Sequence, residues 1–170
     1  MAVALTIRPE RPGDEAAITD VTRGAFAFAP HTSHTEHAIV QALRGAGALS
    51  VSLVAESGGR IVGHIAFSPV SIADGSPDWH GLGPVSVIPR LQGQGIARAL
   101  VEQGLVRLRE LGAQGCVVLG EPALYGRFGF ASDPDLVLPG VPQPYFQSLA
   151  FGPARPRGEV SYHEAFSSPA

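Results

Sequence analysis

The segment whose residue types could most clearly do chemistry is Gln92-Gly93-Gln94-Gly95-Ile96-Ala97, which lies between a strand-like run and a helix-like run. The first N–H groups of a helix have no partner within the helix and carry the positive end of its dipole, so they can hold a phosphate. Glycine at positions 93 and 95 removes the side chains that would keep a diphosphate away from the backbone. The segment therefore indicates an anion-binding loop, and a glycine-rich turn without function is the alternative.

The elements that must position this loop follow from hydrophobic periodicity. Amphipathic spacing predicts helices over residues 14–26, 34–44 and 96–111, and a capping box of Ser33 and Glu36 would start the second. Apolar runs predict strands over residues 4–8, 49–56, 60–70, 82–88, 115–119, 145–151 and 158–162. Residues 61–67 carry apolar side chains at both parities, which places their strand centrally in a sheet. The succession of strand, loop, helix and strand over 82–119 predicts a β-α-β unit with parallel strands.

Two motifs in this framework resemble those of the GNAT superfamily of acetyl-CoA-dependent N-acetyltransferases. The first family motif is Gln or Arg, two residues, Gly, one residue, then Gly or Ala, and Gln92, Gly95 and Ala97 match it. The second is a tyrosine a few residues after the next strand, followed by a Gly-Phe pair, and Tyr125 with residues 126–130 matches it. The resemblance covers residues 5–131, where the order of helices and strands is also that of the family.

The resemblance implies a single α/β (α+β) domain over residues 1–170, with a mixed, mostly antiparallel twisted sheet of about six or seven strands flanked by helices on both faces. Residues 5–131 would form the motif-bearing core, and residues 132–170 would add Pro-rich strands and loops that close one wall of the acceptor site. Trp79 and His80, in a loop predicted over 73–81, would line that site or cover the sheet edge.

By the same resemblance, the pyrophosphate of the cosubstrate acetyl-CoA would lie on the loop after the strand at 82–88. Gln92 would shape this loop, and the amides that hold the pyrophosphate would be those of Gly93, Gln94, Gly95, Ile96 and Ala97. Val85 and Val87 match family positions whose main chain pairs with the pantetheine arm. Residues 82–85 match the place where the family's sheet bulges and opens for the thioester.

The reaction that the resemblance implies moves an acetyl group to a primary amine by direct attack within a ternary complex. Tyr125 matches the family tyrosine that protonates the leaving thiolate, and a phenol with a reference pKa of about 10 is protonated at neutral pH. An aromatic side chain that fills the space between strands is the alternative for Tyr125. A backbone N–H near Val85 to Val87 would polarise the thioester carbonyl. A non-catalytic acyl-CoA-binding sensor on the same fold is the alternative function.

The base that takes the proton from the amine is open among several groups. Glu121 precedes Tyr125 by four residues and could face the amine, or it is a solvated acid before Pro122 at a helix start. Glu36 lies where the family builds its acceptor pocket, although helix capping also explains it. His64 has a suitable reference pKa, although a histidine in a strand is more often a core residue. A water relay would need no dedicated base.

Other reactive side chains point to structural roles. His31, His34 and His37 recur at intervals of three, but positions six apart on a helix lie about 240° apart, so the three cannot share one zinc site. We therefore expect no metal. Cys116 lies in an apolar run and is interpreted as a buried residue rather than a nucleophile.

Composition argues against several classes of partner. The chain has a net charge of −3, and its 12 basic residues are scattered arginines outnumbered by 15 acids, so we expect no nucleic acid partner. No stretch reaches the roughly 18 apolar residues of a membrane helix, so we expect no membrane partner. A single cysteine and the lack of a secretory pattern favour the cytoplasm. We expect a monomer or homodimer that acts on a small-molecule or peptide amine.

A dinucleotide-binding oxidoreductase is a competing interpretation, because Gly93-Gln94-Gly95 precedes a helix. The third glycine position of that fingerprint is Arg98, which is too large for close packing of helix on sheet. Glu121 also lies farther along the chain than the expected distance of about 20 residues. An acyltransferase is therefore the favoured function.

Overall fold

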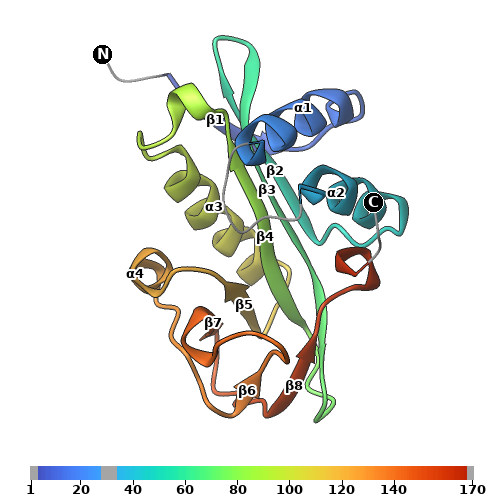
Figure 1. Cartoon of the computed structure of the whole chain (residues 1–170), viewed down its shortest axis with the longest axis vertical. Coiled ribbons are helices and arrows are strands. Elements are labelled where there is room, and N and C mark those ends of the chain that lie inside the picture. The colour runs from blue at the N-terminus through green and yellow to red at the C-terminus, as the bar shows by residue number, and fades with distance from the viewer. Residues whose placement is uncertain (1–3, 28–33, 168–170) are drawn as a thin grey trace.

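The computed structural model describes residues 4–27 and 34–167, which form a mixed sheet with helices on both faces (Figure 1). The strands are β1 (Thr6–Pro9), β2 (Val51–Ser57), β3 (Arg60–Ile72), β4 (Trp79–Val87), β5 (Gly115–Leu119), β6 (Leu136–Val137), β7 (Phe146–Ala150) and β8 (Gly158–Ser161). The helices are α1 (Glu15–Phe26), α2 (Glu36–Gly45), α3 (Ile96–Glu110) and α4 (Pro122–Tyr125). None of the described helices has the length and apolar composition needed to cross a membrane.

The sheet is mostly antiparallel, and its main path runs in the order β1-β2-β3-β4-β5-β7. Strands β4 and β5 pair in parallel and are joined by α3, which confirms the predicted β-α-β unit. Within the described residues the sheet has eight strands, more than predicted. The excess arises because the short strand β6 pairs with β8, and β8 in turn extends the far end of β3.

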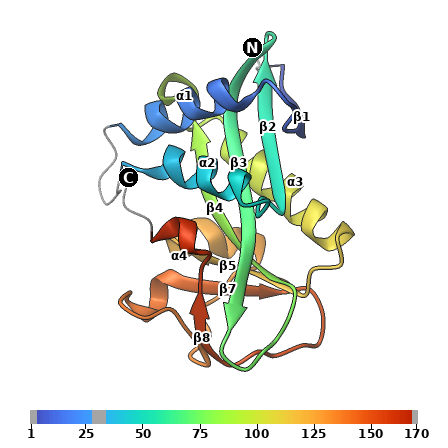
Figure 2. The same ribbon diagram turned by 90° about the vertical axis from the view of Figure 1, so that its right-hand side faces the viewer.

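Two layers of helix enclose the sheet. Helix α3 covers one face, and α1 and α2 cover the other (Figures 1 and 2). On the α3 side, Leu100 and Leu108 are fully buried in one apolar cluster. On the opposite side, Ile18 of α1 packs with Val54 of β2. Because β3 lies between these layers, its residues 62–68 are all buried, and the predicted central position of this strand is confirmed.

Two boundaries differ from the sequence prediction. Helix α2 begins at Glu36 after an N-cap at Thr35, and the Thr35 side chain makes no capping bond. The predicted capping box depends on Ser33, which lies outside the described residues. Strand β4 begins at Trp79, so Trp79 and His80 belong to a strand and not to the loop predicted over 73–81. Parallel pairing with residues 115–117 of β5 extends the strand to that point.

The packing of α3 on β3 depends on a glycine. A Cβ added at Gly104 would lie 2.4 Å from the ring of Phe67, which is 0% exposed and has no free space to move into. Although alanine favours a helix over glycine by about 1 kcal/mol, we expect Gly104→Ala to lower the free energy of unfolding by about 1–3 kcal/mol in chemical denaturation. Gly24→Ala in α1 is the matched control, because nothing lies within 4 Å of its added Cβ. The packing argument would be contradicted if Gly104→Ala and Gly24→Ala raised the free energy of unfolding by the same amount.

Candidate functional site

The site is built around a gap between β4 and β5. The two strands pair in parallel through Trp79, His80 and Gly81, and no register pair among the described residues joins 82–87 to β5. Figure 1 shows β5 turning away from β4 beyond this point. Residues 82–87 therefore keep β3 on one edge and have an open edge on the other.

A bulge in β4 marks the start of the open edge. In the register between β3 and β4, Ile65 pairs with Val85 and Phe67 pairs with Leu82, so two residues of β4 stand opposite a single residue of β3. Such a bulge bends its strand and disrupts the ladder locally. The bulge and broken pairing expected at residues 82–85 are therefore confirmed.

The register also fixes the direction of the main-chain groups of Val85 and Val87. Ile88 N–H donates to Val62 O at 2.9 Å, and antiparallel pairs alternate between hydrogen-bonded and non-hydrogen-bonded ones. Val85 and Val87 therefore form non-hydrogen-bonded pairs with β3, and their N–H and C=O groups point toward the open edge. Gln92 Nε2 donates to one of these groups, Val87 O, at 3.0 Å. The edge presents main-chain groups of the kind that an extended ligand or added strand pairs with.

The loop after β4 leads into α3 through Gly93 (φ 78°) and Gly95 (φ 86°), whose left-handed backbones favour glycine. Gly95 is the N-cap of α3, and a Cβ added there would meet nothing within 4 Å. The side chain of Gln92 ties this loop to β4. Because the first turn of α3 contains no acidic residue, the helix dipole is not offset by a carboxylate of that turn. The loop therefore offers an open, electropositive cradle that fits a pyrophosphate.

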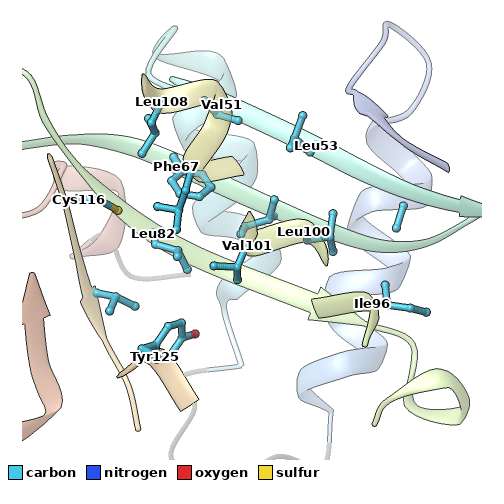
Figure 3. Packing of buried hydrophobic residues seen from close by; sticks show 14 of the residues in the cluster. Val51, Leu53, Phe67, Leu82, Ile96, Leu100, Val101, Leu108, Cys116 and Tyr125 are labelled. Carbon is cyan, nitrogen blue, oxygen red and sulfur yellow. The ribbon is translucent and has the colours of Figure 1, made fainter. Parts of the chain in front are cut away.

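The predicted loop residues fall into two groups. Gln92, Gly93, Gln94, Gly95 and Ala97 are exposed, whereas Ile96 is 3% exposed. Figure 3 shows Ile96 at the start of α3, on the same buried side as Leu100. The Ile96 side chain therefore anchors the helix, and only its backbone amide is placed to contact a ligand.

Tyr125 lies at the other wall of the gap. A Cβ added at Gly120 would come within 2.4 Å of its ring, and the ring centroid lies 6.1 Å from that of Phe130. Tyr125 is 8% exposed, and Figure 3 shows its hydroxyl oxygen directed away from Cys116. Burial raises the pKa of the Tyr125 phenol, and Cys116 raises it further. The phenol therefore keeps its proton at neutral pH and can donate it.

Glu121 is the N-cap of the short helix that carries Tyr125. Its carbonyl oxygen accepts the N–H groups of Leu124 and Tyr125, each at 3.0 Å, so one turn fixes Glu121 and Tyr125 relative to each other. The side chain makes no capping bond and is exposed. None of the ion pairs found in the described part of the chain includes this carboxylate. It is accessible to a cation that approaches from solvent.

Residues 16–130, which contain the loop and Tyr125, match the Acetyltransferase (GNAT) family. The chain is also 41% identical over 127 residues to YhbS of Escherichia coli (strain K12), an uncharacterised N-acetyltransferase; the match covers 74% of this chain and 73% of that protein. The chain belongs to the GNAT acetyltransferase family.

Solved structures of similar chains have the same GNAT fold. A GNAT family acetyltransferase from Brucella melitensis, crystallised with acetyl-CoA, is 50% identical with a TM-score of 0.86, over 96% of this chain and 98% of that chain. YhbS from Escherichia coli, crystallised with CoA, is 37% identical with a TM-score of 0.89, over 99% of this chain and 94% of that chain. The predicted family and its mixed α/β fold are therefore confirmed.

One aromatic residue at the GNAT gap was missed by the sequence prediction. Tyr162 follows β8, and a Cβ added at Gly81 would lie 2.4 Å from its ring. Because Gly81 is the last residue of β4 that pairs with β5, Tyr162 lies where the gap opens. Burial raises the pKa of the Tyr162 phenol, and Cys116 and Tyr125 raise it further. The three side chains are therefore close enough to affect one another electrostatically. The C-terminal segment carries no family motif, so no sequence signal singles this residue out.

His64 is held in the core by a chain of polar contacts. Arg44 pairs with Glu10, and Ser52 Oγ donates to Glu10 Oε1 at 2.7 Å. The same hydroxyl lies 2.8 Å from His64 Nε2, and because its proton is given to Glu10, the histidine must donate Nε2–H to it. His64 is 0% exposed, and burial lowers its pKa from 6.5 to about 4. These contacts favour a neutral core histidine over a base that meets an amine.

The structure also places the other candidate residues of the sequence analysis, which are Cys116, Trp79, His80 and Glu36. Cys116 is 0% exposed and burial raises the pKa of its thiol, so the interpretation as a buried residue is confirmed. Trp79 is 2% exposed within an apolar cluster, and His80 Nδ1 lies 2.8 Å from Ser50 Oγ. Glu36 lines a different hollow of about 250 Å³ between α1 and α2.

Within residues 4–27 and 34–167, no group of three His, Cys, Asp or Glu side chains could hold a metal ion. His31, one of the three histidines considered for a zinc site, lies outside these residues.

The buried histidine predicts a pH dependence of stability. The folded-state pKa of His64 is about 4, below the ordinary value of 6.5, so the unfolded chain binds more protons in this window and stability is lost as the pH falls. We expect the free energy of unfolding of the wild type to fall by about 3 kcal/mol more than that of His64→Gln between about pH 7 and pH 4. Denaturant unfolding at each pH measures this difference. Carboxylates titrate in both proteins, so their effect cancels in the comparison. An equal pH dependence of the free energy of unfolding in the two proteins would show that His64 does not contribute.

Proposed function

We propose that this GNAT protein is an acetyl-CoA-dependent N-acetyltransferase that moves an acetyl group to a primary amine by direct attack within a ternary complex. The observation that carries this proposal is that one fold combines the cradle at the start of α3, the open edge of β4 that leads to it, and the buried, protonated phenol of Tyr125. The crystallised relatives with acetyl-CoA and CoA support the same cosubstrate for this chain.

The chain has groups suited to each part of the cosubstrate. The backbone amides from Gly93 to Ala97 would hold the pyrophosphate, because two glycines leave the approach open and the helix dipole favours the negative charge. The main-chain groups of Val85 and Val87 would pair with the amides of the pantetheine arm. The same edge provides an N–H that polarises the thioester carbonyl, so this step needs no side chain.

Acetyl-CoA supplies the acetyl group as a thioester, whose C–S bond breaks as the amine nitrogen forms a bond to the acetyl carbon. Tyr125 donates its phenolic proton to the leaving sulfur, which its buried, protonated state at neutral pH allows. Glu121 takes the proton that the amine nitrogen loses, directly or through water, and releases it to solvent, while solvent restores the Tyr125 proton. The products are the N-acetylated amine and the free thiol, so atoms and charge balance without a covalent enzyme intermediate.

A sensor that binds acyl-CoA without turnover would need the cradle but not the phenol. Phe at position 125 would fill the space between Gly120 and Phe130 as well as Tyr125 does. The presence of a hydroxyl at this position, directed away from the core residue Cys116, therefore favours an enzyme over a sensor.

The cradle predicts the effect of a carboxylate at Gly95. We expect Gly95→Glu to reduce acetyl-CoA affinity by at least about 100-fold, because it places a negative charge in the cradle and a side chain at φ 86°. Calorimetric titration measures the affinity. Gly112→Glu is the matched control, because Gly112 also has a left-handed backbone (φ 83°) and open space, but lies at the opposite end of α3. Near-normal affinity in Gly95→Glu would remove the loop from the binding site.

The phenol predicts a separation of catalysis from binding. We expect Tyr125→Phe to lower kcat by about 100-fold, the contribution of a positioned general acid, while the Kd for acetyl-CoA stays within a few fold. Steady-state rates of thiol release and calorimetry measure the two quantities. Full activity in this variant would show that another group protonates the thiolate, and unchanged binding with no turnover in the wild type would favour the sensor.

A further inference from the structure

We propose that a cleft beside Glu121 is the acceptor pocket and takes a small primary amine carried on an apolar or aromatic group. This rests on the function proposed above and adds the chemical class of the acceptor. The cleft has a volume of about 590 Å³ and is lined by Leu119, Gly120, Glu121, Val141, Pro142 and Tyr145. Its size falls in the range of small-molecule sites, roughly 300–1,000 Å³.

The lining combines a single charge with apolar walls. Glu121 is the only charged residue among those that line the cleft, and in the described chain no Arg or His forms an ion pair with it. Leu119 is 47% exposed and Tyr145 is 41% exposed, so large apolar surfaces face the opening. An ammonium group would satisfy the carboxylate, and an apolar carrier would cover the walls.

Hydrogen bonds to the backbone hold the cleft in shape. Gly120 N–H donates to Tyr145 O at 2.9 Å, and Gln147 Nε2 donates to Gly120 O at 3.0 Å. Gln147 is 2% exposed, which fixes this contact in the interior. Figures 1 and 2 show α4 beside the orange segment that precedes β7. A ligand therefore meets a preformed surface and does not have to order a loop.

The cleft and Tyr125 belong to neighbouring parts of the chain, but the cleft lies on the other side of the sheet from the cradle. Val118 packs in the same cluster as Tyr125 on the α3 side, and the next residue of the strand, Leu119, points to the opposite face. The carbonyl oxygen of Glu121 accepts the backbone N–H of Tyr125, so one helical turn joins the residue that lines the cleft to the residue that carries the phenol. The amine and the cosubstrate would thus approach the gap from opposite faces.

The test compares two amines that differ in their carrier. Phenethylamine has an aromatic carrier, and 2-methoxyethylamine presents the same primary amine on a short polar chain. We expect the kcat/KM of the wild type, measured by thiol release with saturating acetyl-CoA, to favour phenethylamine by about 10-fold or more. The difference should lie mainly in KM, because the apolar walls bind the carrier and not the reacting atoms.

A variant pair tests whether the cleft causes this preference. Val141→Asp places a carboxylate on an apolar wall, and we expect it to reduce the preference for phenethylamine by about 10-fold while the Kd for acetyl-CoA is unchanged. Val137→Asp is the matched control, since Val137 is 38% exposed in β6 and does not line the cleft. This control should keep the preference of the wild type.

The outcomes separate this inference from the proposed function. Normal acetyl-CoA binding without a preference for phenethylamine, or with a preference that Val141→Asp leaves intact, would overturn the acceptor class alone. Absence of acetyl-CoA binding in the wild type would overturn both proposals. If neither amine is acetylated, titration of the CoA complex with phenethylamine decides: binding that Val141→Asp weakens supports the pocket, and absence of binding overturns it.

Discussion

A β-strand that loses its neighbour exposes a row of main-chain N–H and C=O groups, and the site of this protein depends on where that loss occurs. Pairing between β4 and β5 stops after Gly81 and Val117, while β3 continues to pair with β4 on the other edge. Polar backbone groups away from solvent need a partner, so a gap in the middle of a sheet is stable only when water or a ligand can enter it. The same constraint that makes the gap costly for the fold makes it suited to an extended ligand with amides of its own.

Small residues at the edges of the gap let aromatic rings reach it from two directions. Gly120 leaves room for the ring of Tyr125, and Gly81 leaves room for the ring of Tyr162. Neither glycine has a left-handed backbone, so close approach of a side chain, and not backbone freedom, is the reason that each position is a glycine. The two phenols are brought together by segments that lie far apart in the sequence, because β8 returns to the end of β3.

Periodicity predicted most of the fold, because the central elements are long and have buried faces. In the helix predicted over 96–111, the apolar side chains of Ile96, Leu100 and Leu108 are buried. Leu111 is 62% exposed, because it is the C-cap of α3. The start of β4 at Trp79 was missed, because the pairing that extends it comes from a strand more than thirty residues later, Gly115 to Leu119. Local patterns contain no information about such non-local pairing.

The candidate site likewise has a part that the sequence predicted and a part that it missed. Loop and tyrosine motifs are short and contiguous, so the sequence predicted the family, which is confirmed, and it also predicted roles for Gln92, Gly95 and Tyr125. Tyr162 and the cleft beside Glu121 depend on how the C-terminal segment folds back, and this segment follows no repeating pattern.

The two sides of the gap are anchored differently, and this difference bears on how an acceptor is selected. The side proposed for the cosubstrate is formed by α3, whose residues reach into the main apolar cluster, so its shape is coupled to the stability of the whole sheet. The proposed acceptor side includes Val141 and Pro142, which lie in a connection between β6 and β7. Val141 packs against a smaller apolar cluster, and the Gln143 side chain donates to Leu136 O. Changes in such a connection alter the cleft and leave the main apolar cluster under α3 in place, because Val141 does not belong to that cluster. The chemistry of acetyl transfer can therefore stay fixed while the acceptor side is free to vary, and helix and strand patterns cannot reveal which amine it fits.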